Sequence, residues 1–325
     1  MIEHNRKPIL LLDLDKPKKN KYQFYLDWFK KAWIDAEGGI KPKIDFPFQL
    51  KMILAKSGVA RRIKFSKENT ALLVTGGAYI DFTAFPYNYF YEVVPVFWDT
   101  WKKYHPLMIS SLKRNKVKLA FFTQKEVASL VEREIPGIKT YWLPEGIESA
   151  EYIRGSNLVD RKIQILQFGR KFENYHQVIL KTISANHTYL FSCDDKKIFK
   201  DFKELTQGIS DSAITICFPR SMTHPEITGG IETLTQRYWE CMLSKSLIVG
   251  KAPKELIEIM GYNPVIEVDW RNPGEQLKEL LNCIGEYQSF VNKNYFRALE
   301  VCSWDNRINK LQKILKNHNY EVTFH

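Results

Sequence analysis

The sequence predicts an α/β protein of two domains, each built around a doubly wound parallel sheet. With 325 residues, the chain is too long for one hydrophobic core of ordinary size. Short runs of β-branched and aromatic residues alternate with amphipathic segments through both halves, as is typical of parallel sheets covered by helices. A polar stretch over residues 148–160 separates the two series. We therefore expect one domain over residues 1–150 and a second over residues 151–325.

In the first half, the expected strands are apolar runs that end at polar or small residues. The first, Pro8–Asp15, ends in two carboxylates, and the second, Thr70–Thr75, runs into a pair of glycines. Apolar residues at helical spacing predict helices over 22–35 and 124–134. The remaining strands expected in this half are Val93–Phe97, Val117–Thr123 and Thr140–Leu143.

The second half repeats the alternation of strands and helices. The strands expected there are Ile163–Phe168, Thr188–Ser192, Ile214–Phe218, Ser246–Val249 and Pro264–Val268. Helical periodicity predicts a helix that holds Tyr175 and Ile179, followed by helices over 196–206, 252–260, 274–287 and 289–315.

The segment from Ile214 to Gly250 is the part of the chain that points to a binding site. Its first strand carries no charged residue and is typical of a buried parallel strand. Prolines and glycines exclude regular structure from the loop that follows, and Thr233 or Thr235 is placed to cap the next helix. Unpaired N–H groups and the helix dipole favour an anion at such a helix start. We therefore expect an anionic ligand at this loop.

Two glutamates in this segment are placed to hold two ends of one ligand. Glu232 lies in the loop and Glu240 lies in the helix, with seven residues between them. Together with the strand and the Pro- and Gly-rich loop, this pattern resembles the donor-binding motif of retaining GT-B glycosyltransferases. The resemblance is to the "glycosyl transferases group 1" type, of the kind that builds bacterial surface polysaccharide, and to its branch related to the CgeB spore-maturation proteins. It implies that Glu232 contacts the transferred sugar and that Glu240 holds the ribose hydroxyls.

The residues after the strand Ile163–Phe168 supply the cations that the resemblance requires. In the GT-B family a glycine and an arginine at this place hold the nucleotide diphosphate, usually with a lysine five residues beyond the arginine. That position is Tyr175 here, so Lys171 is expected to replace the lysine. Arg237, one turn before Glu240, is expected either to touch a phosphate or to pair with Glu240. The full set of expected donor-binding residues is Gly169, Arg170, Lys171, Pro219, Arg220, Gly230, Thr233, Leu234, Thr235, Arg237 and Glu240.

The resemblance also implies an arrangement of the whole chain. Two Rossmann-like domains would face a cleft, the first binding the acceptor and the second the nucleotide-sugar donor, with a final helix that crosses back to the first domain. In related enzymes the strand that matches Val93–Phe97 commonly ends in a histidine that touches the donor sugar. This sequence has Asp99 there, and His105 is the nearest histidine. The expected catalytic residues are therefore Glu232 and Asp99.

The reaction that these residues imply is transfer of a sugar from a nucleotide-diphosphate sugar to a glycan or lipid-linked acceptor. The group-1 resemblance implies retention of configuration, and cations with a helix terminus would replace a metal ion at the diphosphate. We expect no metal and no further cofactor. Two alternatives stay open: an inverting GT-B enzyme with Asp99 or His105 as its base, and a non-catalytic GT-B-like binding or structural protein.

The charge of the chain is positive and unevenly distributed. Residues 1–150 carry 25 Lys and Arg against 16 Asp and Glu, a net +9, whereas residues 151–325 carry 23 against 21, a net +2. A basic surface attracts nucleic acid, anionic membrane or phosphorylated substrate. No nucleic-acid-binding motif stands in the first half, so we expect no nucleic acid. The basic and apolar segment Lys41–Lys67 fits a membrane surface, and it fits a core-facing helix with a solvated basic side equally well.

Composition also bears on the compartment. The sequence has no apolar run of about 18 residues and no signal peptide at its start. We therefore expect a cytoplasmic protein that can attach to the inner face of the plasma membrane. The five cysteines are odd in number and form no Cys-x-x-Cys pair, so neither a disulfide framework nor a zinc site is expected.

Overall fold

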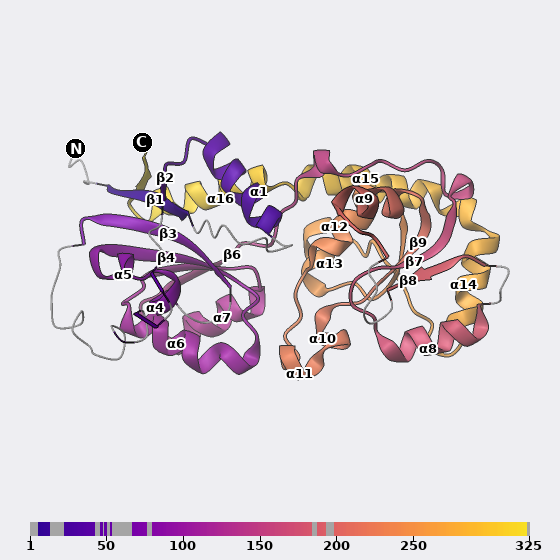
Figure 1. The fold of residues 1–325 in the computed structure, drawn as a ribbon, viewed down its shortest axis with the longest axis horizontal. Helices are drawn as coiled ribbons and strands as arrows, with labels where there is room; N and C mark the ends of the chain where they lie inside the picture. The colour runs from indigo at the N-terminus through magenta and orange to yellow at the C-terminus, as the bar shows by residue number, and fades with distance from the viewer. Residues whose placement is uncertain are drawn as a thin grey trace. The chain divides into compact units, whose positions relative to one another are not determined.

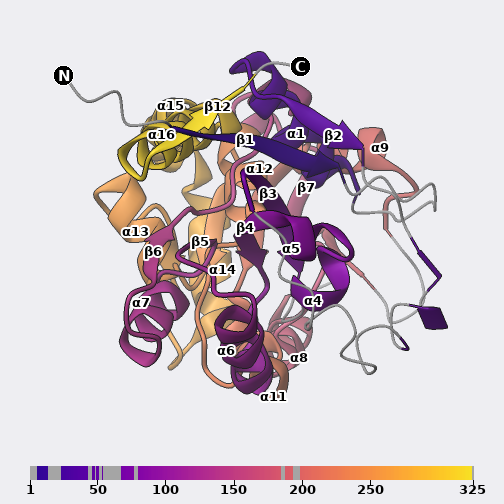
Figure 2. The same cartoon turned by 90° about the vertical axis from the view of Figure 1, so that its left-hand side faces the viewer.

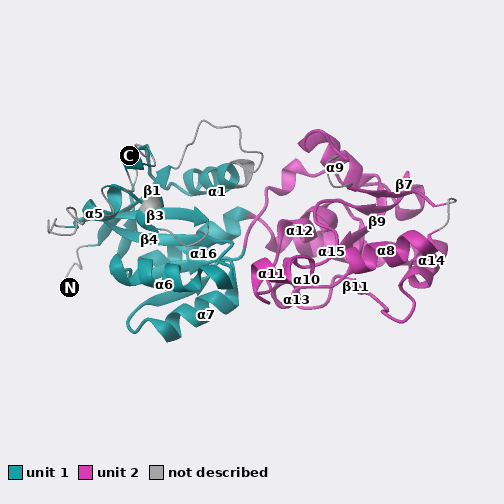
Figure 3. Cartoon of the chain, turned by 60° about the horizontal axis from the view of Figure 1, so that its bottom comes forward, with its two compact units in different colours: residues 1–144, 304–325 teal, residues 145–303 magenta. Residues whose placement is uncertain are grey.

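The computed structural model shows strands and helices alternating along the chain (Figure 1). It describes residues 6–13, 23–42, 46, 47, 49, 50, 53, 67–76, 80–183, 187–192 and 198–323. The chain divides into two compact units, which Figure 3 colours separately. The first unit comprises Met1–Pro144 with Trp304–His325, and the second comprises Glu145–Ser303. This division differs from the expected 1–150 and 151–325 because the last helix and strand pack with the first unit.

Within the described residues, unit 1 holds a seven-stranded sheet in which every pair is parallel. The order is β12-β1-β3-β4-β5-β6, and β1 pairs with β12 along its first residues and with β2 along its last. The interior strands are buried on both faces, as their uninterrupted apolar runs predict. The strands are β1 (Lys7–Asp13), β2 (Ile40–Pro42), β3 (Asn69–Gly76), β4 (Tyr91–Trp98), β5 (Leu119–Phe122), β6 (Lys139–Trp142) and β12 (Tyr320–Val322).

Helices cover both faces of this sheet. Figure 1 and Figure 2 show α1 (Gln23–Asp35) and α16 (Trp304–Asn317) on one side, with α6 (His105–Arg114) and α7 (Lys125–Glu134) on the other. The rings of Phe29 in α1 and Trp304 in α16 meet edge to face, with 5.2 Å between their centres. Both rings belong to the core that also contains the apolar side chains of the central strands. The return of α16 to this sheet is the crossing-back that the sequence predicted.

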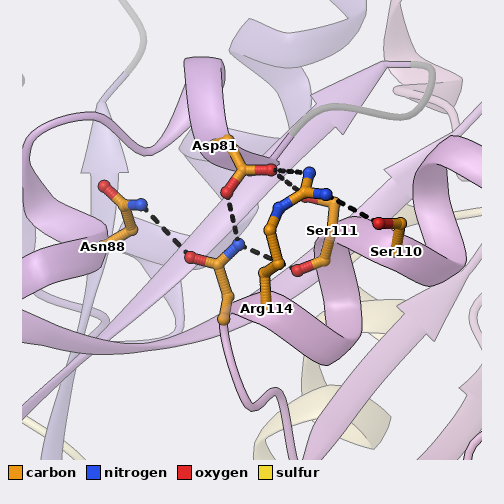
Figure 4. Close-up of polar contacts among 6 residues, drawn as sticks. Asp81, Asn88, Ser110, Ser111 and Arg114 are labelled. Carbon is orange, nitrogen blue, oxygen red and sulfur yellow. Dashed lines mark hydrogen bonds and ion pairs between the residues drawn. The ribbon is translucent and has the colours of Figure 1, made fainter. Parts of the chain in front are cut away.

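A half-buried carboxylate, that of Asp81, fixes the short helix α4 (Ile80–Thr83) on α6 (Figure 4). Asp81 accepts hydrogen bonds from the Ser111 hydroxyl at 2.8 Å, from the Arg114 guanidinium at 2.5 Å and from the Asn115 amide at 2.9 Å. Burial alone would raise the pKa of Asp81, but these three donors outweigh it and hold the pKa below its ordinary value. The next short helix, α5 (Tyr87–Phe90), leads directly into β4.

Unit 2 holds a five-stranded parallel sheet over its described residues, in the order β11-β10-β9-β7-β8. Helices α8 (Glu173–Thr182) and α14 (Pro273–Asn282) lie on one side, while α9 (Phe202–Ser210), α12 (Gln236–Leu243) and α15 (Gln288–Val301) lie on the other (Figure 1). The short helices α10 (Arg220–Thr223) and α11 (Pro225–Thr228) and the helix α13 (Lys254–Met260) belong to the loops. The strands are β7 (Ile163–Gln167), β8 (Tyr189–Phe191), β9 (Ser212–Cys217), β10 (Leu247–Gly250) and β11 (Ile266–Glu267).

Several predicted helices have different bounds in the structure. The helix expected over 289–315 is two helices, because the chain opens at Cys302 and Ser303 and pairs there with Ile147. The helix expected over 196–206 begins at Phe202, where the Asp201 side chain caps the Glu204 N–H at 2.8 Å. The helix expected over 274–287 ends at Asn282 and continues as a 3₁₀ turn.

Most of the basic and apolar segment Lys41–Lys67 lies outside the described residues. Among the helices that the structure describes, none has the length and apolar character needed to cross a bilayer.

Candidate functional site

The loop after β7 depends on a glycine and on an arginine from α12. Gly169 has a φ of +70°, and a Cβ there would stand 2.8 Å from Nη2 of Arg237. Arg237 donates from Nη1 to the carbonyl oxygen of Arg170 at 3.3 Å, and its guanidinium lies over the Phe168 ring at 5.6 Å. In this structure the Arg237 guanidinium holds the backbone of this loop, and its two expected roles stay predictions. Glycine is required at 169 by both backbone angle and space.

Two arginines and a histidine lie in the loops that follow β7 and β9. Arg170 follows β7, Arg220 begins α10 directly after Pro219, and His224 lies between α10 and α11. Burial lowers the pKa of His224, and the nearby charges of Arg170 and Arg220 lower it further, while Glu226 opposes them. β7 and β9 are neighbouring parallel strands, so the loops that carry Arg170, Arg220 and His224 leave the sheet at the same edge. The sequence predicted the two arginines, whereas His224 was missed because nothing in its local pattern marks it.

Lys171 points toward β8. Its Nζ lies 4.0 Å from the Glu173 carboxylate and 5.7 Å from the centre of the Phe191 ring, and its side chain is 17% exposed. Its charge also lowers the pKa of His176, after the larger effect of burial. Lys171 therefore lies beside α8 and β8.

The loop before α12 is tied to the start of α13 by two carboxylates. Gly229 and Gly230 both have positive φ and turn the chain into this loop. The N–H of Leu234 donates to Oε2 of the buried Glu255 at 2.8 Å, and Oε1 of Glu232 accepts from the N–H of Lys254 at 2.5 Å. Each segment thus satisfies a backbone N–H of the other. We call these two bonds the loop–α13 clasp.

The clasp changes what the predicted residues do. Glu232, for which the resemblance implies a contact with the transferred sugar, binds the first turn of α13 in this structure. Leu234 and Thr233 are buried, and the Leu234 N–H that was expected to face an anion is bound by Glu255. Thr235 is the capping residue of α12, and its side chain makes no capping hydrogen bond. Glu255 was not predicted, although an acidic residue in a first helical turn is a recognisable signal.

Glu240 is buried within unit 2. It lies in the second turn of α12 with 4% of its surface exposed, and its Oε1 accepts from the Tyr152 hydroxyl at 3.0 Å. Tyr152 lies 88 residues earlier in the chain and was not predicted. A buried carboxylate needs such a donor, because desolvating an unpaired charge is costly.

In unit 1, the two residues expected near the sugar differ in their environment. Asp99 directly follows β4, is exposed, and has a φ of +54°, which is uncommon for a residue other than glycine. His105 is buried, and its Nε2 lies 3.2 Å from the Thr100 carbonyl oxygen. Thr100 is in turn bound through its N–H to the Gln124 side chain at 3.1 Å. His105 therefore supports the turn after β4, whereas Asp99 stands at the carboxyl edge of the sheet.

Among the described residues, no group of three or more His, Cys, Asp and Glu side chains is placed to hold a metal ion. The structure brings together Gly169, Arg170 and Arg237 in one cluster, and Arg220 and His224 follow β9, the strand that pairs with β7. Glu232 and Glu240 occupy separate places, one at α13 and the other against Tyr152.

No protein-family model matches this sequence, and no curated protein gives a significant match. Solved structures do match. Alr3699/HepE from Anabaena, in complex with UDP and glucose, is 12% identical over 96% of this chain and 100% of that chain, with a TM-score of 0.59. Sucrose-phosphate synthase from Thermosynechococcus elongatus is 9% identical over 96% of this chain and 99% of that chain, with a TM-score of 0.59.

A third similar structure is AviGT4, a glycosyltransferase involved in avilamycin A biosynthesis. It is 8% identical over 96% of this chain and 98% of that chain, with a TM-score of 0.54. Identities this low report on the fold, and each match spans both units. The two parallel-sheet units and these likenesses together identify the fold of this chain as GT-B.

Proposed function

We propose that this protein is a glycosyltransferase that moves a hexosyl group from a nucleotide-diphosphate sugar to a glycan or lipid-linked acceptor. The observation that carries the proposal is that Arg170, Arg220 and His224 lie in the loops that follow the adjacent parallel strands β7 and β9, at the carboxyl edge of the unit 2 sheet. Ligands of open α/β sheets bind outside the carboxyl ends of the strands. Two guanidinium groups and an imidazole suit a diphosphate, because charge-assisted bonds to its oxygens are the strong ones.

The similar structures support a nucleotide-sugar donor. Alr3699/HepE was solved with UDP and with UDP-glucose, and the pneumococcal O-GlcNAc transferase GtfA was solved with UDP and GlcNAc. In this protein we assign the diphosphate to Arg170 and Arg220, the ribose to Glu240, and the transferred sugar to Glu232. Glu232 can keep one carboxylate oxygen on the Lys254 N–H and offer the other to a sugar hydroxyl.

The chemistry follows from charge at the leaving group. Breaking the bond between sugar and diphosphate leaves negative charge on the phosphate, and fixed cations there stabilise the transition state. We propose a retaining, metal-independent transfer with no further cofactor. Activity that persists after EDTA treatment, with product anomer assigned by NMR, tests both statements.

One alternative has an observation of its own. Asp99 is an exposed carboxylate at the carboxyl edge of the unit 1 sheet, where it could act as the base of an inverting enzyme. Asp99→Asn would then abolish transfer while leaving donor binding unchanged. The product of the wild-type enzyme would have inverted configuration. His105 is not proposed as the base, because its ring is buried against Thr100.

For the acceptor side, we propose that the basic first half brings the enzyme to an anionic membrane surface that carries the lipid-linked acceptor. The support is the net charge of +9 over residues 1–150 against +2 over residues 151–325.

The experiment that tests the function measures donor binding by calorimetry and transfer by release of nucleotide. UDP, GDP, ADP and dTDP are screened first, because a ligand at 100 times its dissociation constant adds about 2.7 kcal/mol to stability. Arg170→Ala should weaken binding of the best nucleotide by about 1.5–3 kcal/mol, the worth of hydrogen bonds to a charged group. Arg170→Lys should recover little, since an ammonium cannot reproduce a bidentate contact.

The matched control is Arg271→Ala, which removes a highly exposed arginine from the same unit. It should leave nucleotide affinity unchanged. Equal affinities in wild type and Arg170→Ala would remove the diphosphate assignment, and a protein that binds none of the four nucleotides would contradict the proposed function itself.

A further inference from the structure

The segment from Glu145 to Tyr152, which we call the α12 strap, contacts one face of α12 at two successive turns. Gln236 donates from Nε2 to the carbonyl oxygen of Gly146 at 3.2 Å. Four residues later, Glu240 accepts from the Tyr152 hydroxyl at 3.0 Å. Residues four apart lie on the same face of a helix, so both bonds join the same two elements. The strap therefore sets the position of the side chain that we assign to the ribose.

The strap is itself anchored away from α12. The N–H of Ile147 donates to the carbonyl oxygen of Cys302 at 2.9 Å. Within the strap, the N–H of Tyr152 donates to the carbonyl oxygen of Ser149 at 3.3 Å and closes a short turn. The Tyr152 ring packs edge to face on Phe202 in α9, with 5.6 Å between ring centres. With 8% of its surface exposed, Tyr152 has little freedom to turn. Its hydroxyl is thus presented to Glu240 by a fixed ring.

We propose that Tyr152 is a positioning residue for nucleotide ribose recognition: it holds the Glu240 carboxylate in the orientation that accepts from the ribose hydroxyls. The proposal rests on the proposed function, because it takes Glu240 as the ribose ligand. The Tyr152 hydroxyl is the donor in this bond and Oε1 of Glu240 is the acceptor. A carboxylate offers about four lone-pair sites, so Glu240 can keep this bond while it accepts from a diol.

The consequence is a specificity that Tyr152 should control. Glutamate has several rotatable bonds, and a bond that restricts them before the ligand arrives removes an entropic cost of binding. This smaller entropic cost favours a ligand whose ribose hydroxyl donates to Glu240. It does not favour a deoxynucleotide that lacks that hydroxyl. Loss of the Tyr152 hydroxyl should therefore weaken ribonucleotides and leave the matching deoxynucleotides nearly unchanged.

The test compares the nucleoside diphosphate that binds best with its 2′-deoxy and 3′-deoxy forms, by calorimetry on the full chain. In wild type, at least one deoxy form should bind about tenfold or more weakly, the effect of losing a hydrogen bond to a charged group. Tyr152→Phe keeps the ring on Phe202 and removes only the hydroxyl. It should lower ribonucleotide affinity several-fold and change deoxynucleotide affinity less than about twofold. The ratio of ribonucleotide to deoxynucleotide affinity, which we call the discrimination ratio, should therefore fall.

Two further variants separate positioning from stability. Tyr262→Phe removes another tyrosine hydroxyl bond in the same unit, to Asn294 at 2.9 Å, and should leave the ratio unchanged. In the double variant Tyr152→Phe with Glu240→Gln, the two losses should not add, because Tyr152 acts through Glu240.

The outcomes are distinguishable. If Tyr152→Phe has the same discrimination ratio as wild type, Tyr152 does not position Glu240 for the ribose, and the proposed function stands. Equal weakening of ribo and deoxy forms shows a general structural role and also overturns it. A wild-type protein that binds nucleotide diphosphate without distinguishing either deoxy form removes Glu240 from the ribose, and one that binds no nucleotide contradicts the proposed function as well.

Discussion

The protonation of His224 should depend on whether a diphosphate occupies the proposed site. In the free protein, burial and the charges of Arg170 and Arg220 keep its pKa below the ordinary 6.5, against the opposing charge of Glu226. A bound diphosphate would bring negative charge to the same place and favour the protonated imidazole. Binding would therefore raise the pKa of His224 and take up a proton.

The expected result is that UDP-glucose, whose phosphates do not titrate near neutral pH, binds more tightly as the pH falls through the range in which His224 takes up its proton. The sign follows from linkage: a group whose pKa is higher in the bound state strengthens binding below that pKa and ceases to do so above it. Calorimetry in two buffers with different ionisation heats should detect this proton uptake on binding. His224→Gln should remove both the uptake and the pH slope. If the variant keeps the wild-type slope, another group carries the proton.

The loop–α13 clasp is a feature of two elements acting together. The loop that carries Glu232 has no regular structure, and its position depends on the bonds of Leu234 to Glu255 and of Glu232 to Lys254. Because Leu234 is 1% exposed, its N–H cannot turn to water when the acceptor is lost. The clasp should therefore contribute both to stability and to the placement of Glu232.

Glu255→Ala should lower the free energy of unfolding by about 1–3 kcal/mol, the cost of leaving a buried N–H without its acceptor. Glu255→Gln keeps an oxygen acceptor and should lose less. Urea denaturation measures the difference, and donor transfer measures whether Glu232 is displaced. Glu258→Ala, on the exposed side of the same helix, is the control and should change neither. A Glu255→Ala protein with wild-type stability would mean that the clasp is energetically neutral.

The whole molecule carries its positive charge in the half that we assign to the acceptor. Attraction to an anionic surface is worth about 1 kcal/mol for each basic residue close to it. Vesicle sedimentation should therefore show binding that rises with anionic lipid and falls as salt screens the charges. Changing Arg61, Arg62 and Lys64 to Gln should weaken binding by about 3 kcal/mol if all three lie at the surface.

The matched control changes Lys162, Lys203 and Arg271 to Gln, which removes the same charge from exposed positions of unit 2. It should affect vesicle binding little. A wild-type protein that stays in solution with anionic vesicles at low salt would exclude the membrane proposal without affecting the donor site.

Local sequence was sufficient to predict most strands and two α/β domains with parallel sheets, and the resemblance of the Ile214–Gly250 segment added the GT-B architecture. Strands such as Asn69–Gly76 and Ser212–Cys217 are buried on both faces, and short uncharged runs rich in β-branched residues are typical of such strands. The break at Cys302 and Ser303 was not predictable, because neither glycine nor proline marks it and the chain opens there to bond with Ile147. That bond joins positions far apart in the sequence, which no helical period records.

The same limit applies to the candidate site. The sequence by itself determined which loops and helix carry Arg170, Glu232 and Glu240, since each follows from a strand end or a helical turn. Only the tertiary structure decided what each side chain contacts: Glu240 meets Tyr152 from 88 residues away, and Glu232 binds the first turn of α13. Periodicity reports the face of an element to which a residue belongs. The partner on that face is set by packing between elements distant in the chain, where a buried polar group must find a donor or an acceptor.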